Sequence, residues 1–258
     1  MPLWAAIPFV LVPRARRQIA QNLERVIGPS KVAPARAYGV LLSFAQSLAN
    51  SYAAHGGRGV EVKAQIEGAE RLAEARDAGR GVIVATGHIG PWQLGPYLLE
   101  QAGYAPVVLA MAREIDAGVQ QVEELLELRR RFRVVYTDGT FAALDLLRVL
   151  REGGLVAVQI DRPNGHASLR LPFVGGEAPF ASGPAALARA AESPIVPVFL
   201  IATGPFRVRV EVGEPIGVAR TKDREADVEA ATRTLASAYE ACVREHPYQW
   251  YAFHDFWA

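Results

Sequence analysis

Cysteine is the rarest amino acid in this sequence. Cys242 is its single cysteine among 258 residues. One thiol can form neither an internal disulfide nor a zinc site built from several cysteine ligands. Such scarcity is typical of a protein in a reducing compartment.

The sequence also lacks an excess of charge of either sign. The 28 Lys and Arg residues face 27 Asp and Glu residues, which leaves a formal net charge of +1. A balanced chain has no general attraction for a polyanion, so nucleic acid is excluded as the expected partner. Half of the residues are hydrophobic and 21% are charged, which excludes a disordered or fibrous protein.

No hydrophobic run is long enough to cross a bilayer. The longest apolar stretch covers residues 2–12 and contains Pro8, whereas a spanning helix needs about twenty apolar residues. Arg14, Arg16 and Arg17 follow the stretch, while a secretory signal carries its positive charge in front. An apolar segment followed by basic residues suits a membrane surface. Two interpretations stay open: a membrane-surface anchor, or a first helix packed on its own domain.

What the sequence does contain is a regular alternation of strand and helix patterns beyond residue 58. The residues before it are helical in pattern, with helices expected at 15–27 and 32–54. We expect strands at residues 60–66, 82–85, 106–110, 134–136, 155–160, 195–202 and 206–212. The remaining expected helices cover residues 69–78, 91–102, 116–131, 141–151, 182–191 and 224–244.

This alternation predicts an α/β fold, in which a single domain holds a mostly parallel mixed sheet covered by helices. A helical N-terminal extension, residues 1–57, precedes the α/β domain of residues 58–258. Residues 162–180 are rich in Gly and Pro and are expected to form a long loop. The last two strands are expected to form an antiparallel pair at an edge of the sheet.

The loop after the strand at 82–85 holds the first candidate for chemistry. Ligands of open α/β sheets bind at the carboxyl ends of the strands. His88 lies there, between Gly87 and Gly90. A histidine titrates near neutrality and suits general-base work. The alternative is a histidine that only satisfies a turn or caps a helix.

The segment Gly-His-Ile-Gly-Pro-Trp-Gln-Leu-Gly at 87–95 resembles the first motif of the glycerolipid and lipid A acyltransferase superfamily, in which four residues separate a His from an Asp or Glu. Further segments resemble that family, its lipid A late-acyltransferase branch in particular, in order along the chain. They are Arg17–Leu23, Arg113, Asp161-Arg162, Leu171–Gly176, Ser182–Ala188, Ser193–Val198, Tyr248–His254 and Trp257.

The resemblance implies transfer of a fatty acyl group from a thioester to a hydroxyl of a lipid or glycolipid. The donor would be acyl-CoA or an acyl carrier protein, with no further cofactor and no metal. The resemblance also implies a bacterial enzyme of lipid biosynthesis that is peripheral on the cytoplasmic face of the inner membrane. His88 would be the general base, and backbone N–H groups at the start of the 91–102 helix would help to hold the oxyanion.

The resemblance also assigns substrate-binding candidates. Arg113 and Arg162 would bind a phosphate of the donor or acceptor, with surface ion pairs as the alternative. Trp92 would line the acyl tunnel or fill core. Gly90 and Ser182 lie in matched segments and are further candidates for substrate contact.

Asp161 is a further candidate for substrate binding and is interpreted as an orienting or structural residue rather than a base. His254, in the terminal motif, is expected to pack or to form structural hydrogen bonds.

Position 93 departs from the motif, because Gln stands where the family carries Asp or Glu. Gln93 could set the tautomer of His88 but could not neutralise its imidazolium. It is a natural variant of a slower enzyme, an introduced change, or a sign of lost chemistry. Asp138, Asp161 and Glu100 are candidates to replace the carboxylate. If Gln93 limits the base, Gln93→Glu should raise the rate by orders of magnitude.

The alternative functions follow from this departure. One is an acyltransferase that acts on a soluble or carrier-bound secondary-metabolite intermediate. Another is a catalytically impaired lipid-binding homologue. A third is a thioester hydrolase, in which water replaces the alcohol.

Overall fold

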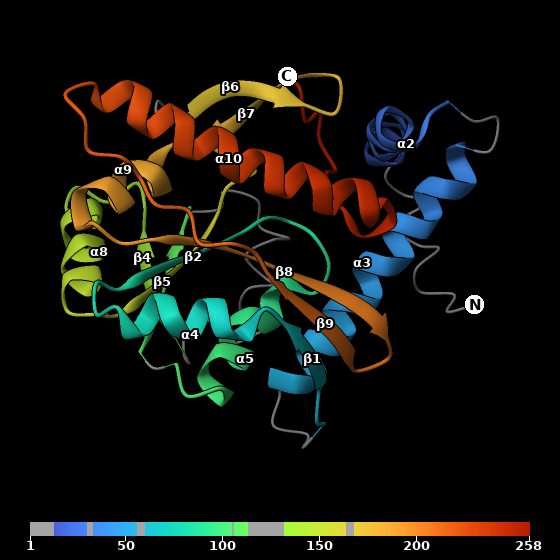
Figure 1. Cartoon of the computed structure of the whole chain (residues 1–258). Helices are drawn as coiled ribbons and strands as arrows, with labels where there is room; N and C mark the ends of the chain where they lie inside the picture. The colour runs from blue at the N-terminus through green and yellow to red at the C-terminus, as the bar shows by residue number, and fades with distance from the viewer. Residues whose placement is uncertain (1–12, 30–32, 56–59, 105, 113–131, 164–167) are drawn as a thin grey trace.

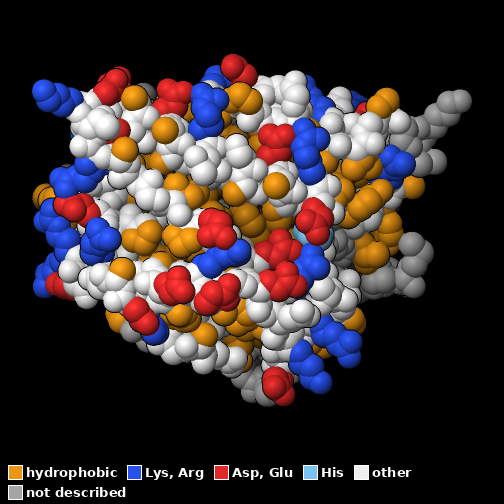
Figure 2. Space-filling view, in the orientation of Figure 1, with side chains coloured by type: hydrophobic (Ala, Val, Ile, Leu, Met, Phe, Trp, Pro, Cys, Tyr) orange, Lys and Arg blue, Asp and Glu red, His pale blue; other side chains and the backbone are white. Residues whose placement is uncertain are grey.

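The computed structural model describes residues 13–29, 33–55, 60–104, 106–112, 132–163 and 168–258. The described chain folds into a mixed sheet with helices on both faces and a pair of helices at one end (Figure 1). Acidic and basic side chains are interspersed over the face seen in Figure 2, as expected from the balanced charge.

The helix pair at the end of the molecule consists of α2 (Pro13–Ile27) and α3 (Ala33–His55), both expected from the sequence. In α2 the apolar side chains Ile19 and Leu23 are buried one turn apart. Among the described residues, none of the helices combines the length and the apolar composition that crossing a bilayer requires.

The main sheet has seven strands in the order β1-β9-β8-β2-β5-β3-β4. Their bounds are β1 (Lys63–Glu67), β2 (Val82–Thr86), β3 (Val107–Met111), β4 (Arg133–Tyr136), β5 (Leu155–Gln159), β8 (Ile195–Gly204) and β9 (Arg207–Val212). All neighbouring pairs are parallel except β8 and β9, which are antiparallel. The predicted antiparallel pair is therefore present, but its edge position was wrong, because β1 pairs in parallel with β9 and is itself the edge strand.

The central strands are buried on both faces, as parallel strands between two helix layers must be. On β2, Ile83 and Ala85 face the layer of α8 (Ala142–Arg151), α9 (Gly183–Ala191) and α10 (Arg224–Glu245). Val82 and Val84 face the opposite layer, which contains α4 (Ala69–Asp77) and α5 (Gly95–Gln101). A short 3₁₀ helix, η2 (Trp92–Leu94), precedes α5, so the helix expected at 91–102 begins with a 3₁₀ turn.

The loop expected at 162–180 is the clearest error of the sequence prediction. Its described part is an antiparallel hairpin of β6 (Ser168–Phe173) and β7 (Gly176–Ala181). Val174 and Gly175 join the strands with φ of 47° and 72°, the positive values that a two-residue hairpin turn needs. Phe173 and Phe180 are buried in the core and their packing stabilises the hairpin. The Gly and Pro content of the segment gave no indication of this packing. The helix predicted at 116–131 lies outside the described residues.

Candidate active site

The side chains of His88 and Asp161 meet at the carboxyl edge of the sheet. His88 follows β2 and Asp161 follows β5, and these strands are neighbours. The imidazole Nδ1 lies 2.9 Å from Asp161 Oδ1, and the His88 backbone N–H donates to Oδ2 at 2.8 Å. The side chains are 12% and 2% exposed. With the carboxylate accepting, Nδ1 carries the hydrogen and Nε2 carries the lone pair.

A tyrosine from α10 completes the surroundings of this carboxylate. The Tyr239 hydroxyl donates to Asp161 Oδ2 at 2.7 Å and is fully buried. Its ring lies against Gly87, where an added Cβ would be 2.4 Å from the ring. Gly87 thus permits the close packing that brings Tyr239 to the carboxylate.

The electrostatics of Asp161 favour the anion. Burial alone would raise the pKa of Asp161, but the adjacent His88 and the hydrogen bonds from His88 and Tyr239 hold that pKa well below its usual range. Burial, together with the negative charge of Asp161, raises the pKa of the Tyr239 hydroxyl, which stays a neutral donor. Because the pKa of Asp161 is lowered, its ionised form stabilises the fold above the unfolded value of about 4, and this contribution is lost on acidification.

The loop that carries His88 is pressed against β8. Gly90 has φ of 55°, and an added Cβ would lie 1.8 Å from the carbonyl oxygen of Leu200. Only glycine satisfies both the positive φ and this close approach. The packing gives Gly90 a structural role, and its contact with substrate stays a prediction.

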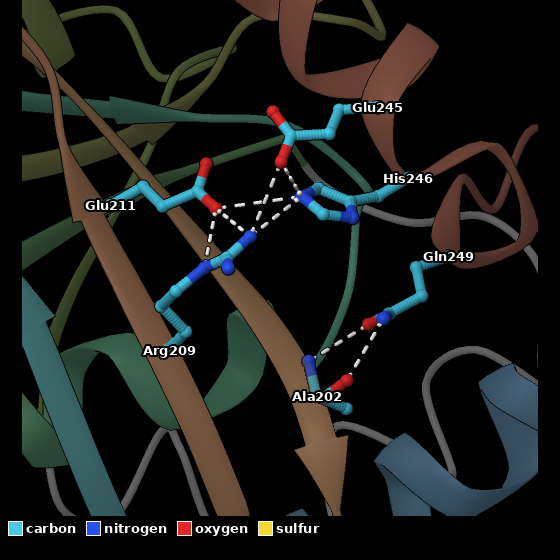
Figure 3. A network of polar contacts seen from close by, with 6 residues as sticks. All are labelled: Ala202, Arg209, Glu211, Glu245, His246 and Gln249. Carbon is cyan, nitrogen blue, oxygen red and sulfur yellow. Dashed lines mark hydrogen bonds and ion pairs between the residues drawn. The ribbon is translucent and has the colours of Figure 1, made fainter.

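The segment after α10 fixes the same loop from the other side. Gly90 N–H donates to Gln249 O at 2.8 Å, and Tyr251 N–H donates to His88 O at 2.8 Å. The Gln249 side chain in turn forms two hydrogen bonds with the backbone of Ala202 on β8, at 2.8 and 3.0 Å (Figure 3). The C-terminal segment therefore joins the His88 loop to the sheet.

A second polar cluster lies beside that segment, and it has the residue types of a metal site. Glu211, Glu245 and His246 bring their ligand atoms close together. The Arg209 guanidinium lies among them, 2.8 Å from Glu211, 3.4 Å from Glu245 and 3.1 Å from His246 Nε2 (Figure 3). The positive charge that the carboxylates attract is thus supplied by arginine, and the cluster is an ion-pair network.

An apolar cavity of about 230 Å³ lies on the α4 and α5 side of the sheet. Among its lining residues are Leu72, Val84, Leu99, Leu109, Ala157 and Val210. Trp92 also lines it, and the Trp92 ring lies edge-on to the His88 ring at 5.4 Å. The cavity therefore reaches the neighbourhood of the histidine.

Gln93 is 2% exposed and lines this cavity. The sequence suggested Gln93 as the acceptor for His88 Nδ1, but that nitrogen carries one hydrogen and Asp161 accepts it. Of the three carboxylates considered as replacements, Asp161 is the one beside His88. This corrects the interpretation of Gln93 as the partner of the base.

The other candidates are placed as follows. Arg113 lies outside the described residues. Arg162 directly follows Asp161, and burial, with the charge of Arg162, lowers the pKa of His254. Ser182 is the N-terminal cap residue of α9, but no side-chain capping bond is formed in the described structure. The substrate roles of Arg162 and Ser182 stay predictions.

Three side chains at or near the site escaped the sequence analysis. Tyr239 lies in a helix with no motif around it. Thr86 and Gln159 line the cavity at the ends of β2 and β5. The sequence feature that could have indicated Thr86 and Gln159 is a polar residue at the end of an otherwise apolar buried strand.

The comparisons place this chain among acyltransferases. The model of the bacterial lipid A biosynthesis acyltransferase family matches residues 5–258. The phosphatidylinositol mannoside acyltransferase of Mycolicibacterium smegmatis is 25% identical over 253 residues, which cover 93% of this chain and 79% of that protein. The crystal structure of the 1-acyl-sn-glycerophosphate acyltransferase PlsC from Thermotoga maritima matches 93% of this chain and 97% of its own, with 16% identity and a TM-score of 0.39.

The chain therefore belongs to the bacterial lipid A biosynthesis acyltransferase family and is an acyltransferase. The expected class of enzyme and the expected α/β fold are both confirmed.

Tyr239→Phe tests how the third hydrogen-bond donor to Asp161 acts on the His88–Asp161 pair. Without this donor, the pKa of Asp161 is lowered less, so its ionised form contributes less stability. We expect the acid limb of the profile of Tm against pH to move to higher pH.

Tyr251→Phe is the matched control, because the Tyr251 hydroxyl is also buried and is bonded to Ser47 at 2.7 Å. It should lower Tm but leave the acid limb in place. An unmoved limb in Tyr239→Phe would contradict the role assigned to this hydroxyl.

Proposed function

We propose that this enzyme transfers a fatty acyl group from a thioester, on CoA or an acyl carrier protein, to a hydroxyl of a lipid or glycolipid acceptor. His88 is the general base. The observation that carries the proposal is the buried Asp161 carboxylate behind His88, beside an apolar cavity.

The proton transfers follow from the tautomer. Nε2 of His88 takes the proton of the acceptor hydroxyl as its oxygen attacks the thioester carbonyl carbon. The tetrahedral adduct collapses, the C–S bond breaks, and the imidazolium returns the proton to the departing sulfur. Asp161 stabilises the imidazolium between the two transfers and keeps the ring oriented.

The cavity is suited to the alkyl chain of the donor. Burying methylene groups against Leu and Val side chains contributes about 0.8 kcal/mol per CH₂. Trp92, which lines the cavity and contacts the His88 ring, would pack against the end of the chain nearest the reacting carbonyl. Binding of the chain would thus hold the carbonyl close to the base.

A glycolipid is the acceptor class that the comparisons favour. The Mycolicibacterium smegmatis relative is named for acylation of a phosphatidylinositol mannoside, and the family for lipid A biosynthesis. Either acceptor presents a sugar hydroxyl near a phosphate, to which Arg162 could bind. The impaired-homologue alternative loses its main support, because Asp161 supplies the carboxylate that position 93 lacks.

A lipid acceptor requires contact with a membrane surface, which we assign to the helix pair. Arg14 and Arg17 are exposed on α2, opposite the buried Ile19 and Leu23. Hydrophobic side chains gather over the region of α3 in Figure 2. Basic residues beside apolar side chains suit an anionic leaflet, such as the cytoplasmic face of a bacterial inner membrane.

His88→Ala and Asp161→Asn test the base and its partner. His88→Ala removes the proton acceptor, and Asp161→Asn removes the charge that stabilises the imidazolium. Each should lower kcat for acyl transfer by about 10³-fold or more, measured as release of CoA from hexadecanoyl-CoA with glycolipid vesicles.

The matched controls are His246→Ala and Asp227→Asn. His246 belongs to the Arg209 network, and Asp227 is a buried carboxylate bonded to Arg189 at 2.9 Å. These variants should lower stability without a comparable loss of kcat. Wild-type turnover in His88→Ala would overturn the mechanism.

Gln93→Glu separates the two interpretations of position 93. The carboxylate for His88 is already present, and a second one in a mostly apolar cavity is costly to ionise. We now expect kcat/KM to fall by about tenfold or more and Tm to decrease. A rise in rate would instead return the partner role to position 93.

The double variant Arg14→Gln, Arg17→Gln tests the membrane surface. Each arginine near an anionic leaflet contributes about 1 kcal/mol, so sedimentation with phosphatidylglycerol vesicles should weaken by at least about tenfold. Arg148→Gln, Arg151→Gln on α8 is the control and should sediment like the wild type. Equal binding of all three proteins would exclude α2 as the contact.

A further inference from the structure

Two buried hydrogen-bond groups lie where the apolar cavity approaches the active site. Thr86 and Gln159 are partners in register at the ends of β2 and β5, and both line the cavity. Thr86 Oγ1 and Gln159 Nε2 are buried, and neither has a hydrogen-bond partner among the residues that the structure describes.

Such groups are unusual in a folded chain. A buried donor without a partner destabilises the protein, because it has lost its hydrogen bonds to water. Valine at 86 and methionine at 159 would fill similar space without this cost. Two such groups side by side in a cavity point to a ligand that accepts hydrogen bonds.

The position of the two groups along their strands says which part of a ligand they meet. Successive same-face residues of a strand are about 6.6 Å apart. From the edge inward, β2 and its loop place His88, then Thr86, then Val84. The neighbouring strand places Asp161, then Gln159, then Ala157. The order is therefore base, polar pair, apolar cavity.

An acyl thioester in the act of transfer has the same order. The attacking hydroxyl lies at the base, the carbonyl group comes next, and the alkyl chain follows. The polar pair thus coincides with the carbonyl group when the chain lies in the cavity and the hydroxyl lies at His88.

The backbone donors expected from the sequence are already used. The N–H groups of Ile89, Gly90, Trp92 and Leu94 donate to carbonyl oxygens within the protein, and Pro91 has no N–H. The start of the helix expected at 91–102 therefore supplies few free donors to an oxyanion.

We propose that the Thr86 hydroxyl and the Gln159 side-chain amide donate hydrogen bonds to the carbonyl oxygen of the acyl thioester. The proposal rests on the function proposed above. As the acceptor oxygen attacks, the C=O π electrons move onto this oxygen, and the two donors stabilise the negative charge. When the C–S bond breaks, the electron pair returns to the carbonyl and the sulfur takes the proton from His88.

Thr86→Val and Gln159→Met test the proposal, because each keeps the side-chain volume and removes the donor. We expect kcat with hexadecanoyl-CoA to fall by about 10²-fold in each variant. Tm should stay equal or rise, since a buried group without a partner is removed. A residue with only a structural role would not combine lower kcat with undiminished stability.

Thr232→Val is the matched control. Thr232 is buried in α10, and its hydroxyl donates to Val228 O at 2.7 Å. This variant should keep the wild-type kcat and lose some stability. Thr86→Val is expected to lower kcat without loss of Tm, and Thr232→Val is expected to lower Tm without loss of kcat. The comparison therefore does not depend on the general effect of a Thr→Val change.

Binding of unreactive analogues separates this inference from the proposed function. S-hexadecyl-CoA has the chain without a carbonyl, and S-(2-oxoheptadecyl)-CoA carries a ketone that one methylene group separates from the sulfur. Calorimetry should show that the wild type binds the ketone about fivefold more tightly or better, and that the double variant Thr86→Val, Gln159→Met binds both alike.

Wild-type kcat in the variants, or an undiminished preference for the ketone in the double variant, would overturn the inference while the acyltransferase reaction stands. Failure of the wild type to transfer an acyl group from either hexadecanoyl-CoA or a hexadecanoyl acyl carrier protein would instead overturn the proposed function, and this inference with it.

Discussion

One buried carboxylate organises the site. Asp161 accepts hydrogen bonds from the backbone and ring of His88 and from Tyr239, so a loop, a strand end and a helix converge on its two oxygens. A carboxylate this deeply buried stays ionised only because these donors surround it. The glycines of the His88 loop follow from the same constraint, since Gly87 admits the Tyr239 ring and Gly90 lets the loop approach β8.

Successive side chains of a strand point to opposite faces of the sheet, and the two faces of this sheet have different surroundings. On β2, Ile83 and Ala85 pack with α8, α9 and α10 and build the larger core. Val84 and Thr86 face the other way and line the cavity. The same strand therefore contributes to the larger core on one face and lines the cavity on the other, and His88 and Asp161 lie at the edge of the sheet where the two faces meet.

Much of this was accessible from the sequence. Period and turn residues gave the alternating elements, and the ordered motifs gave the family. Spacing could not choose among Asp138, Asp161 and Glu100, because the distance between His88 and Asp161 depends on β2 and β5 being neighbours although 73 residues separate the two side chains. No local sequence pattern marked Tyr239 as a site residue. The hairpin of β6 and β7 was missed because its glycine and proline residues are typical of loops, whereas its strands depend on packing in the core that the local sequence does not show.

The C-terminal segment at residues 249–252 bonds to two parts of the chain that are synthesised much earlier, so it determines when their contacts can form. Asn22 in α2 donates to the carbonyl oxygen of Ala252, 230 positions away, while Gly90 and His88 are bonded to Gln249 and Tyr251. A nascent chain that has completed the sheet still lacks both contacts. The hydrogen bonds that hold the His88 loop and those that attach α2 to the C-terminal segment are therefore completed together, only after residues 249–252 have been synthesised.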